Sequence, residues 1–459
     1  MMRRPRSPRA RPATKLAGDD TMKTPRRTKK QPQWLLLPTT LISTRGIFLC
    51  VFAGAFLFMI WSILRFFGLF VQHDVVKIKA HPRVGAYYYA WYEPKQWEIW
   101  KTKFPPELGL YPSQSNATLS SHSKWARQAG IDFFLMSWSD KRNHENVLHY
   151  LNHPDTIPIT LHIESMILYL DSRVNRTAQE NGIIKFNEKA KNIYTGTLCR
   201  FGDAYRDYLF KAMDEIVLPY RHKYLFVGDR PVFVLYLARE FFDFENDIYN
   251  LRQDFYQKYG VHPYLIADVV WFLWDHRVRK NTLNTGIHAW DAITAYNRYE
   301  GRKTETLDEY MERLEVEYDK YSNPDILKNI RLPVVPYVQP GYDDLLIRAH
   351  EHGPNNATRP YYERNNGMTY HKFWDQAERI LGKNPCSVDP KNELFIFVCS
   401  FNEWHESTSI EPSTEWKTMY LDITRQRKES LKGYCTTDVT RTLPKDLLTS
   451  HQGSSSVPK

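Results

Sequence analysis

The stretch LFIFVCSFNEWHE at residues 394–406 decides both the fold prediction and the functional prediction. Its first part, Leu394–Ser400, is apolar and rich in β-branched and aromatic side chains, which is typical of a buried strand. Two carboxylates, Glu403 and Glu406, follow this strand directly. Because carboxylates this close repel each other, the pKa of one rises and the pKa of the other stays low. This separates a proton donor from a base or nucleophile, and cleavage of a glycosidic acetal requires both.

Seven similar apolar runs precede this one, and polar, helix-compatible segments separate them. The eight runs are Val84–Tyr92, Ile131–Trp138, Ile157–Glu164, Pro231–Leu237, Tyr264–Val270, Ala292–Asn297, Leu332–Val338 and Leu394–Ser400. The amphipathic stretches between them include Ser121–Gly130, Tyr205–Val217, Ile248–Tyr259, Thr306–Tyr321 and Tyr370–Leu381. Eight strands that alternate with helices predict an α/β fold, a single (β/α)8 barrel. A doubly wound open sheet is the competing layout, although no Gly-rich phosphate loop follows any of these strands.

The N-terminal region differs in composition from the rest of the chain. Residues 1–45 hold 12 of the 62 Lys and Arg and 2 of the 52 Asp and Glu, so they carry the whole net charge of +10. The remainder has no basic excess to bind phosphates, which argues against a nucleic-acid partner. Residues 46–71 are apolar apart from Arg65 and are long enough to cross a bilayer. A cleaved signal peptide is the weaker interpretation, because the segment lies deep in the chain and lacks a small-residue cleavage site.

The positive-inside rule gives a domain plan for the whole chain. We predict a basic cytoplasmic tail at 1–45, a transmembrane signal-anchor at 46–71 and a short stem at 72–83. A luminal (β/α)8 catalytic domain then covers 84–435, and the polar tail at 436–459 is expected to be disordered. This is the plan of a single-pass type II membrane protein.

Glycosylation sequons and cysteines are compatible with a luminal domain. The sequons begin at Asn116, Asn175 and Asn356. The luminal cysteines are Cys199, Cys386, Cys399 and Cys435, for which three disulfide pairings remain open. Cys399 lies inside an apolar strand and is a candidate free thiol. No CxxC motif or Cys/His cluster indicates zinc, and neither a metal nor a cofactor is expected.

The predicted strand ends bring together a set of candidate substrate-binding residues. In a (β/α)8 barrel, functional side chains lie at the C-terminal ends of the strands. Carboxylates, indoles, imidazoles and phenols occur there, and the candidates are Trp91, Tyr92, Trp138, His162, Glu164, Tyr296, Tyr342, Trp404 and His405. Trp404, beside the two catalytic candidates, offers an apolar plate for a sugar ring, whereas His405 is expected to orient its neighbours. Packing in the core is an equal alternative for Trp91, Trp138 and Tyr342.

Several of these segments match one known family in order, over roughly residues 84–425. They are Ala86–Tyr92, Pro106–Tyr111, Leu135–Trp138, Thr160–Glu164, Pro336–Tyr342, Ser400–Glu406 and Ile410–Glu411. The core Asn402–Glu406 is the most specific of them. In these segments the chain resembles glycoside hydrolase family 99 (GH99), the endo-α-1,2-mannosidases. The sequence departs from the family pattern at Ser407, where Gly is common, and in the loops 93–104 and 139–143, so the substrate beyond the cleaved linkage stays open.

The resemblance implies an activity and a mechanism. A family member is a retaining enzyme of the Golgi, or of another early secretory compartment, that cleaves inside mannose-rich, glucosylated N-glycans or N-glycoproteins. Glu403 would be the base for the 2-hydroxyl of the substrate, which then forms a 1,2-anhydro sugar. Glu406 would protonate the leaving oxygen and later activate water, and Glu164 would hold the sugar in the −1 subsite. Direct attack by a carboxylate about 5 Å from the acid is the ordinary alternative.

Two other classes of function remain open on this sequence. A luminal glycan-binding protein without catalysis would use the same fold, because a fold does not fix a function. Both candidate catalytic carboxylates are present, which argues against this class. A Golgi glycosyltransferase would share the predicted topology, but the acidic pairs, such as Asp343 and Asp344, do not have the Asp-x-Asp spacing of a nucleotide-sugar metal site.

Overall fold

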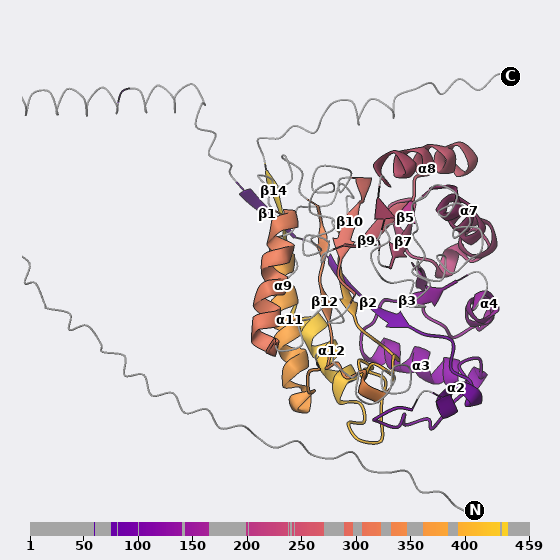
Figure 1. The fold of residues 1–459 in the computed structure, drawn as a ribbon, viewed down its shortest axis with the longest axis vertical. Helices are drawn as coiled ribbons and strands as arrows, with labels where there is room; N and C mark the ends of the chain where they lie inside the picture. The colour runs from indigo at the N-terminus through magenta and orange to yellow at the C-terminus, as the bar shows by residue number, and fades with distance from the viewer. Residues whose placement is uncertain are drawn as a thin grey trace, which may run out of the picture. The chain divides into compact units, whose positions relative to one another are not determined.

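The chain divides into two units in the computed structural model, 1–72 and 73–459, and the second contains the predicted barrel. The structure describes residues 59, 75–79, 81–99, 101–139, 143–164, 199–200, 202–236, 238, 241–242, 244–269, 289–296, 305–322, 332–346, 361–383, 393–431 and 434–438. Strands occupy the middle of the second unit, and helices lie around them (Figure 1).

Every predicted run contains a strand of one parallel sheet. The strands are β2 (His81–Tyr88), β3 (Phe133–Trp138), β4 (Ile159–Ile163), β7 (Arg230–Leu235), β9 (Tyr264–Asp268), β10 (Ala292–Thr294), β11 (Val334–Val335), β12 (Tyr337–Val338) and β13 (Glu393–Val398). Neighbours pair in the order β11-β10-β9-β7-β4-β3-β2-β13-β12. A short strand, β6 (Phe226–Val227), adds to β7 in the antiparallel sense. The observed boundaries are one to four residues shorter than predicted at most strand ends.

The sheet is nearly closed because its two end strands are halves of one chain segment. Val334 and Val335 pair with β10, whereas Tyr337 and Val338 pair with β13. Pro336 separates the two halves; it has no N–H to donate to a ladder, but its carbonyl accepts the Phe397 N–H at 3.0 Å. With β11 and β12 counted as one strand, the eight parallel strands form a nearly closed barrel. This is consistent with (β/α)8 and not with an open doubly wound sheet.

The helices follow the strands as predicted and bury one face each. They are α2 (Pro94–Ile99), α3 (Asn116–Gln128), α4 (His144–Asn152), α7 (Gly202–Ala212), α8 (Phe244–Tyr259), α9 (Leu307–Ser322), α11 (Met368–Leu381) and α12 (Met419–Ser430). In α11 the buried Tyr370, Phe373, Trp374, Ala377 and Leu381 recur at the spacing of an amphipathic helix. Short pieces complete the fold: the π-turn Met213–Val217, the 3-10 turns Arg221–Lys223 and Asn365–Gly367, and the parallel pair β5 (Cys199–Arg200) and β8 (Phe241–Phe242).

A small separate sheet joins the two ends of the described unit. Strand β1 (Val75–Lys79) pairs with β14 (Tyr434–Asp438) in the antiparallel sense, from Val75 opposite Asp438 to Lys79 opposite Tyr434. β1 lies within the predicted stem, and β14 crosses the predicted boundary between the catalytic domain and the C-terminal tail. The barrel domain therefore has an ordered β connection outside its main sheet.

Several sequence predictions concern residues outside the described set. Within the described residues, no helix is long and apolar enough to span a membrane. The predicted span at 46–71 lies outside them except for Met59, and so do the sequons at Asn175 and Asn356. Asn116 is described, and it is exposed at the start of α3. Cys399 is buried and free of any disulfide, as its place in an apolar strand predicts.

The barrel interior is filled by aromatic rings, and this demands a glycine in β2. The Phe133 ring of β3 meets the Phe395 and Phe397 rings of β13 edge to face, with centroids 5.9 and 6.4 Å apart. A Cβ atom added to Gly85 would lie 2.3 Å from the Phe133 ring and 2.7 Å from the Leu135 side chain. Only glycine fits at this position without moving the packed rings.

We predict that Gly85→Ala destabilises the barrel by about 1–3 kcal/mol, because the Phe133 ring has to leave its packed position. Gly382→Ala is the matched control, since its Cβ would meet nothing closer than 3.6 Å and its φ of −64° suits alanine. Thermal unfolding of the full chain, followed by circular dichroism, measures both. A Gly85→Ala variant as stable as Gly382→Ala would contradict this packing argument.

Candidate active site

The two predicted catalytic carboxylates lie on the loop that follows β13. This loop closes on itself at its base, where the Ser400 carbonyl accepts the Ile410 N–H at 3.0 Å. The Ser400 hydroxyl lies 2.9 Å from the Thr408 hydroxyl and accepts the Glu403 N–H at 2.8 Å. Glu403 is 5% exposed, and Glu406 is partly exposed. One carboxylate is therefore buried in the loop while the other reaches its surface.

Asn402 fixes the same loop to the end of the first barrel strand. Its side-chain oxygen accepts the Tyr89 N–H at 2.8 Å, and its side-chain nitrogen donates to the Tyr89 carbonyl at 2.8 Å. The Phe401 N–H also donates to the Tyr87 carbonyl at 2.8 Å. The Asn402 amide thus takes the place of a neighbouring strand. It satisfies the backbone N–H and carbonyl of Tyr89, which lies just past the end of β2.

Glu403 has two donors on one oxygen and negative charge nearby. Its Oε1 atom accepts the Tyr92 hydroxyl at 3.3 Å and the His405 N–H at 3.2 Å. Burial raises the pKa of Glu403 well above its usual range, and the charge of Glu406 raises it further. The two donors lower the pKa and offset part of this effect, whereas the charge of Glu164 raises it. When ionised, Glu403 is therefore a stronger base than an ordinary carboxylate.

His405, which lies between the two carboxylates in the sequence, is buried and is electrically neutral near pH 7. Burial lowers the pKa of its imidazole to about 3. Its ring lies against Tyr92, with centroids 5.2 Å apart, and near Trp97 at 6.3 Å. A neutral ring among aromatic groups agrees with an orienting role and gives no proton donor at physiological pH.

Glu164, at the end of β4, brings a third carboxylate to this end of the barrel. Its Oε1 atom accepts the Ser137 hydroxyl at 2.8 Å and lies 3.6 Å from His162 Nδ1. Its backbone N–H donates to the Trp138 carbonyl at 3.1 Å. The side chain of Glu164 is 12% exposed and that of His162 is 1% exposed, so the carboxylate is the more accessible of the two.

Two tyrosines, just past the ends of β2 and β10, meet near the carboxylates. The Tyr89 and Tyr296 hydroxyls form a short hydrogen bond. Burial raises the pKa of both phenols well above 10, with contributions from the Glu403 and Glu406 charges. Tyr89 contacts the partly exposed Trp91 ring, with centroids 4.5 Å apart. The sequence predicted Tyr296 and Trp91 but not Tyr89, which lies just past β2, where strand alternation no longer tells which way a side chain points.

Four of the predicted substrate-binding residues are buried beneath the site. Tyr92, Trp138, Trp404 and Tyr342 are at most 1% exposed. Trp138 donates to His144 Nδ1 at 3.3 Å, and Tyr342 donates to Asp344 at 3.1 Å. Trp404 is stacked on Trp416, with centroids 5.9 Å apart, and donates to a carboxylate of its own loop, so its ring is buried rather than exposed as expected. These side chains hold the site together rather than line it.

Arg364, which sequence reasoning did not single out, holds the end of the catalytic loop. Its Nη2 atom donates to the Ser407 carbonyl at 2.9 Å and to the Ser409 carbonyl at 2.8 Å. Its guanidinium lies 3.9 Å from the centre of the Trp416 ring. Ser407 has a φ of +52°, the left-handed region that favours glycine. This conformation explains why the GH99 pattern commonly has Gly at this position.

Comparisons with known proteins agree on the fold. The structure is similar to the GH99 endo-α-mannosidase from Bacteroides thetaiotaomicron in complex with bis-tris-propane, with 16% identity and a TM-score of 0.50 over 76% of this chain and 97% of that chain. This chain has the GH99 fold. It is also similar to a structure described as a glycoside hydrolase-like protein, with 17% identity and a TM-score of 0.53 over 76% and 94% of the two chains.

Sequence comparisons add one family. Residues 200–424 match the family model of the glycosyltransferase WbsX, and this range includes Glu403 and Glu406. No curated protein matches the sequence significantly. The resemblance to GH99 that the motifs indicate is therefore confirmed at the level of the fold.

We predict that Glu403→Gln stabilises the protein near neutral pH. A carboxyl whose pKa is raised by folding binds its proton more tightly in the folded state, so its ionisation destabilises the fold as pH rises above the unfolded pKa of about 4.3. Gln accepts the same two hydrogen bonds without this penalty. The Tm of Glu403→Gln should exceed that of the wild type by a few degrees at pH 7, and the difference should vanish near pH 4. An unchanged or lowered Tm at pH 7 would contradict the burial argument.

Proposed function

We propose that this protein is a retaining endo-α-mannosidase that hydrolyses an internal linkage of a mannose-rich glycan. The observation that carries the proposal is the buried Glu403 beside the partly exposed Glu406 at the C-terminal end of a GH99-type barrel. Glu164 and the Tyr89–Tyr296 pair supply further polar groups to the same end. The catalytic groups of barrel enzymes occupy this end.

Glu403 would act as the base in its ionised form, in which burial makes its carboxylate a stronger base than an ordinary one. In this mechanism Glu403 removes the proton of the substrate 2-hydroxyl, and that oxygen attacks C1 while the bond from C1 to the leaving oxygen breaks. Glu406 gives its proton to the leaving oxygen. Mannose has an axial 2-hydroxyl, which lies anti to an axial leaving group at C1, so this attack is stereochemically possible.

Water completes the reaction with the same two groups. Glu406, now ionised, removes a proton from water, which opens the 1,2-anhydro sugar at C1, and Glu403 returns its proton to the 2-oxygen. Two inversions at C1 give overall retention, and both carboxyl groups end in their starting states. We assign to Glu164, which already accepts a hydrogen bond from Ser137, the role of holding the sugar that is attacked.

Glycosyl transfer is the second candidate, because the matching family model carries the name of a glycosyltransferase. The same carboxylate pair would then pass the sugar to an acceptor hydroxyl rather than to water. Incubation with a mannose-rich glycan, in the presence and absence of a second sugar acceptor or of nucleotide sugars, separates the two candidates. Glycan binding without turnover is the third outcome and would indicate a lectin-like protein.

The deciding experiment is digestion of two glycans by the full chain, with mass analysis of the products. One is a glucosylated mannose-rich N-glycan, and the other is its non-glucosylated counterpart. Release of a glucosyl-mannose fragment would support the full proposal. Release of a mannosyl-mannose fragment would support the activity with a different neighbouring sugar, where the loops 93–104 and 139–143 depart from the family pattern. No release from either glycan would overturn it.

We also propose a luminal location, in the Golgi or another early secretory compartment, with residues 46–71 as the membrane anchor. Support comes from the apolar segment and from the basic residues before it. The exposed Asn116 at the start of α3 is compatible with N-glycosylation. A loss of mass on enzymatic deglycosylation of the protein from cells, abolished by Asn116→Gln together with the other sequon changes, would support this location.

We predict that Glu406→Gln lowers kcat by about 100-fold or more on the glycan and much less on an aryl mannoside with a good leaving group. The leaving oxygen of a sugar needs a proton, whereas an activated phenolate does not. Binding of the glycan, measured by calorimetry, should remain close to the wild-type value. Equal losses on both substrates would move the acid role away from Glu406.

A further inference from the structure

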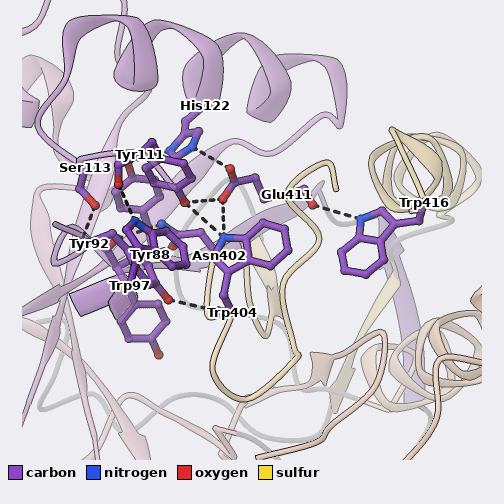
Figure 2. A network of polar contacts seen from close by, with 11 residues as sticks. Tyr88, Tyr92, Trp97, Tyr111, Ser113, His122, Asn402, Trp404, Glu411 and Trp416 are labelled. Atoms are coloured by element: carbon purple, nitrogen blue, oxygen red, sulfur yellow. Dashed lines mark hydrogen bonds and ion pairs between the residues drawn. The ribbon is translucent and has the colours of Figure 1, made fainter. Parts of the chain in front are cut away.

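A buried carboxylate outside the proposed catalytic pair lies at the end of the same loop. The Glu411 side chain is 0% exposed. Its Oε1 atom lies 3.1 Å from His122 Nε2, and its Oε2 atom accepts the Tyr111 hydroxyl at 2.6 Å and Trp404 Nε1 at 2.9 Å. Figure 2 shows this network between the loop and the N-terminal part of the barrel.

All the partners of Glu411 can donate to it. The Tyr88 hydroxyl lies 2.9 Å from His122 Nδ1. If this hydroxyl donates to Nδ1, the neutral imidazole carries its proton on Nε2 and donates to Glu411. An ionised carboxylate then receives three hydrogen bonds, from an imidazole, a phenol and an indole. A buried carboxylate is tolerated when its acceptor sites are satisfied in this way.

The network continues from Glu411 to the catalytic base. Its indole partner, Trp404, donates its backbone N–H to the Tyr92 hydroxyl at 3.1 Å, and that hydroxyl donates to Glu403 Oε1 at 3.3 Å. The Tyr92 ring is stacked on Trp97, with centroids 4.3 Å apart. Trp404 is therefore fixed at two points, its ring by Glu411 and its backbone by the hydroxyl that holds Glu403.

We infer that Glu411 is a positioning residue, whose buried carboxylate fixes Trp404 and through it the catalytic carboxylate of Glu403. This inference rests on the proposed function. Glu411 does not touch the substrate, because it is fully buried. It acts through Trp404 and Tyr92 on the Glu403 carboxylate.

The chemistry of the network requires a carboxylate at position 411 rather than an amide. In Glu411→Gln one oxygen becomes an NH2 group, which is a donor. If this NH2 group faced Tyr111 and Trp404, a donor would point at two other donors. Facing His122, it would require the other imidazole tautomer, and the Tyr88 hydroxyl would lose the acceptor for its proton. Either orientation leaves a buried donor without its acceptor and moves the indole.

The test compares the full-length wild type with Glu411→Gln on a glycan and on an activated aryl mannoside. We expect kcat/KM to fall by about 100-fold, since a displacement of about 1 Å at a reacting group costs this much. The loss should lie in kcat, with KM little changed. It should be equal on the two substrates, because the base acts on the 2-hydroxyl whatever the leaving group. A merely structural role would lower Tm and leave kcat/KM of the folded variant unchanged at temperatures below the transition.

Asp291→Asn is the matched control. The Asp291 carboxylate accepts hydrogen bonds from Arg230 at 2.5 Å and from Arg252 at 2.6 Å. Asp291 precedes β10, so it lies at the opposite end of the barrel from the site. This variant should lower Tm and leave kcat/KM unchanged at temperatures below the transition. Tyr111→Phe, which removes only one donor to Glu411, serves if Glu411→Gln does not fold, and it should give a smaller loss with the same equality between substrates.

The outcomes separate the two proposals. An inactive wild type would overturn the proposed function, and the positioning role of Glu411 with it. An active wild type with full activity in folded Glu411→Gln, or in Tyr111→Phe where that variant is used, would overturn the positioning role alone. A loss confined to the glycan would also overturn it, because it would place the effect on the proton donor and not on Glu403.

Discussion

Burial of carboxylates in one loop is the constraint on which the site depends. Glu411 is buried with three donors around it, whereas Glu403 is buried with two donors and the charges of Glu406 and Glu164 nearby. The first carboxylate has hydrogen-bond partners on both of its oxygens, which tie the end of the loop to the residues around it. The second is not fully compensated, and burial raises its pKa. The Glu411 end of the loop is therefore held by hydrogen bonds. The Glu403 end carries a carboxylate whose burial destabilises the fold and makes the group reactive.

The barrel makes this arrangement possible by supplying partners from distant parts of the chain. The loop directly follows β13. Its Asn402 side chain bonds to Tyr89, just past β2, and its Glu411 contacts His122 of α3. Direct parallel pairing of β13 with β2 brings the first and last strands side by side, with Gly85 of β2 opposite Phe397 of β13. This pairing places the residues after β2 next to the loop after β13, where Asn402 bonds to Tyr89.

Strand periodicity and the positions of strand ends were enough to predict the eight strands, the nearly closed barrel and the place of Glu403, Glu406 and Glu164. They could not predict which rings are exposed. Trp404 follows the strand as a sugar-stacking residue would, yet it is buried, with its indole N–H bonded to Glu411 and its ring stacked on Trp416. Two of the three partners of Glu411, His122 and Tyr111, lie 289 and 300 positions away in the chain, so no local pattern reveals them. Arg364 and Tyr89 were missed for the same reason: their roles come from tertiary contacts.

The most direct test of the account is the anomeric configuration of the sugar first released from an α-1,2-linked mannoside. Proton NMR of the fresh product, recorded before mutarotation, distinguishes the two anomers. The mechanism, in which Glu403 recruits the substrate 2-hydroxyl and Glu406 then activates water, predicts the α-anomer. It also predicts no turnover of the 2-deoxy analogue. Initial release of the β-anomer would contradict the roles assigned to Glu403 and Glu406.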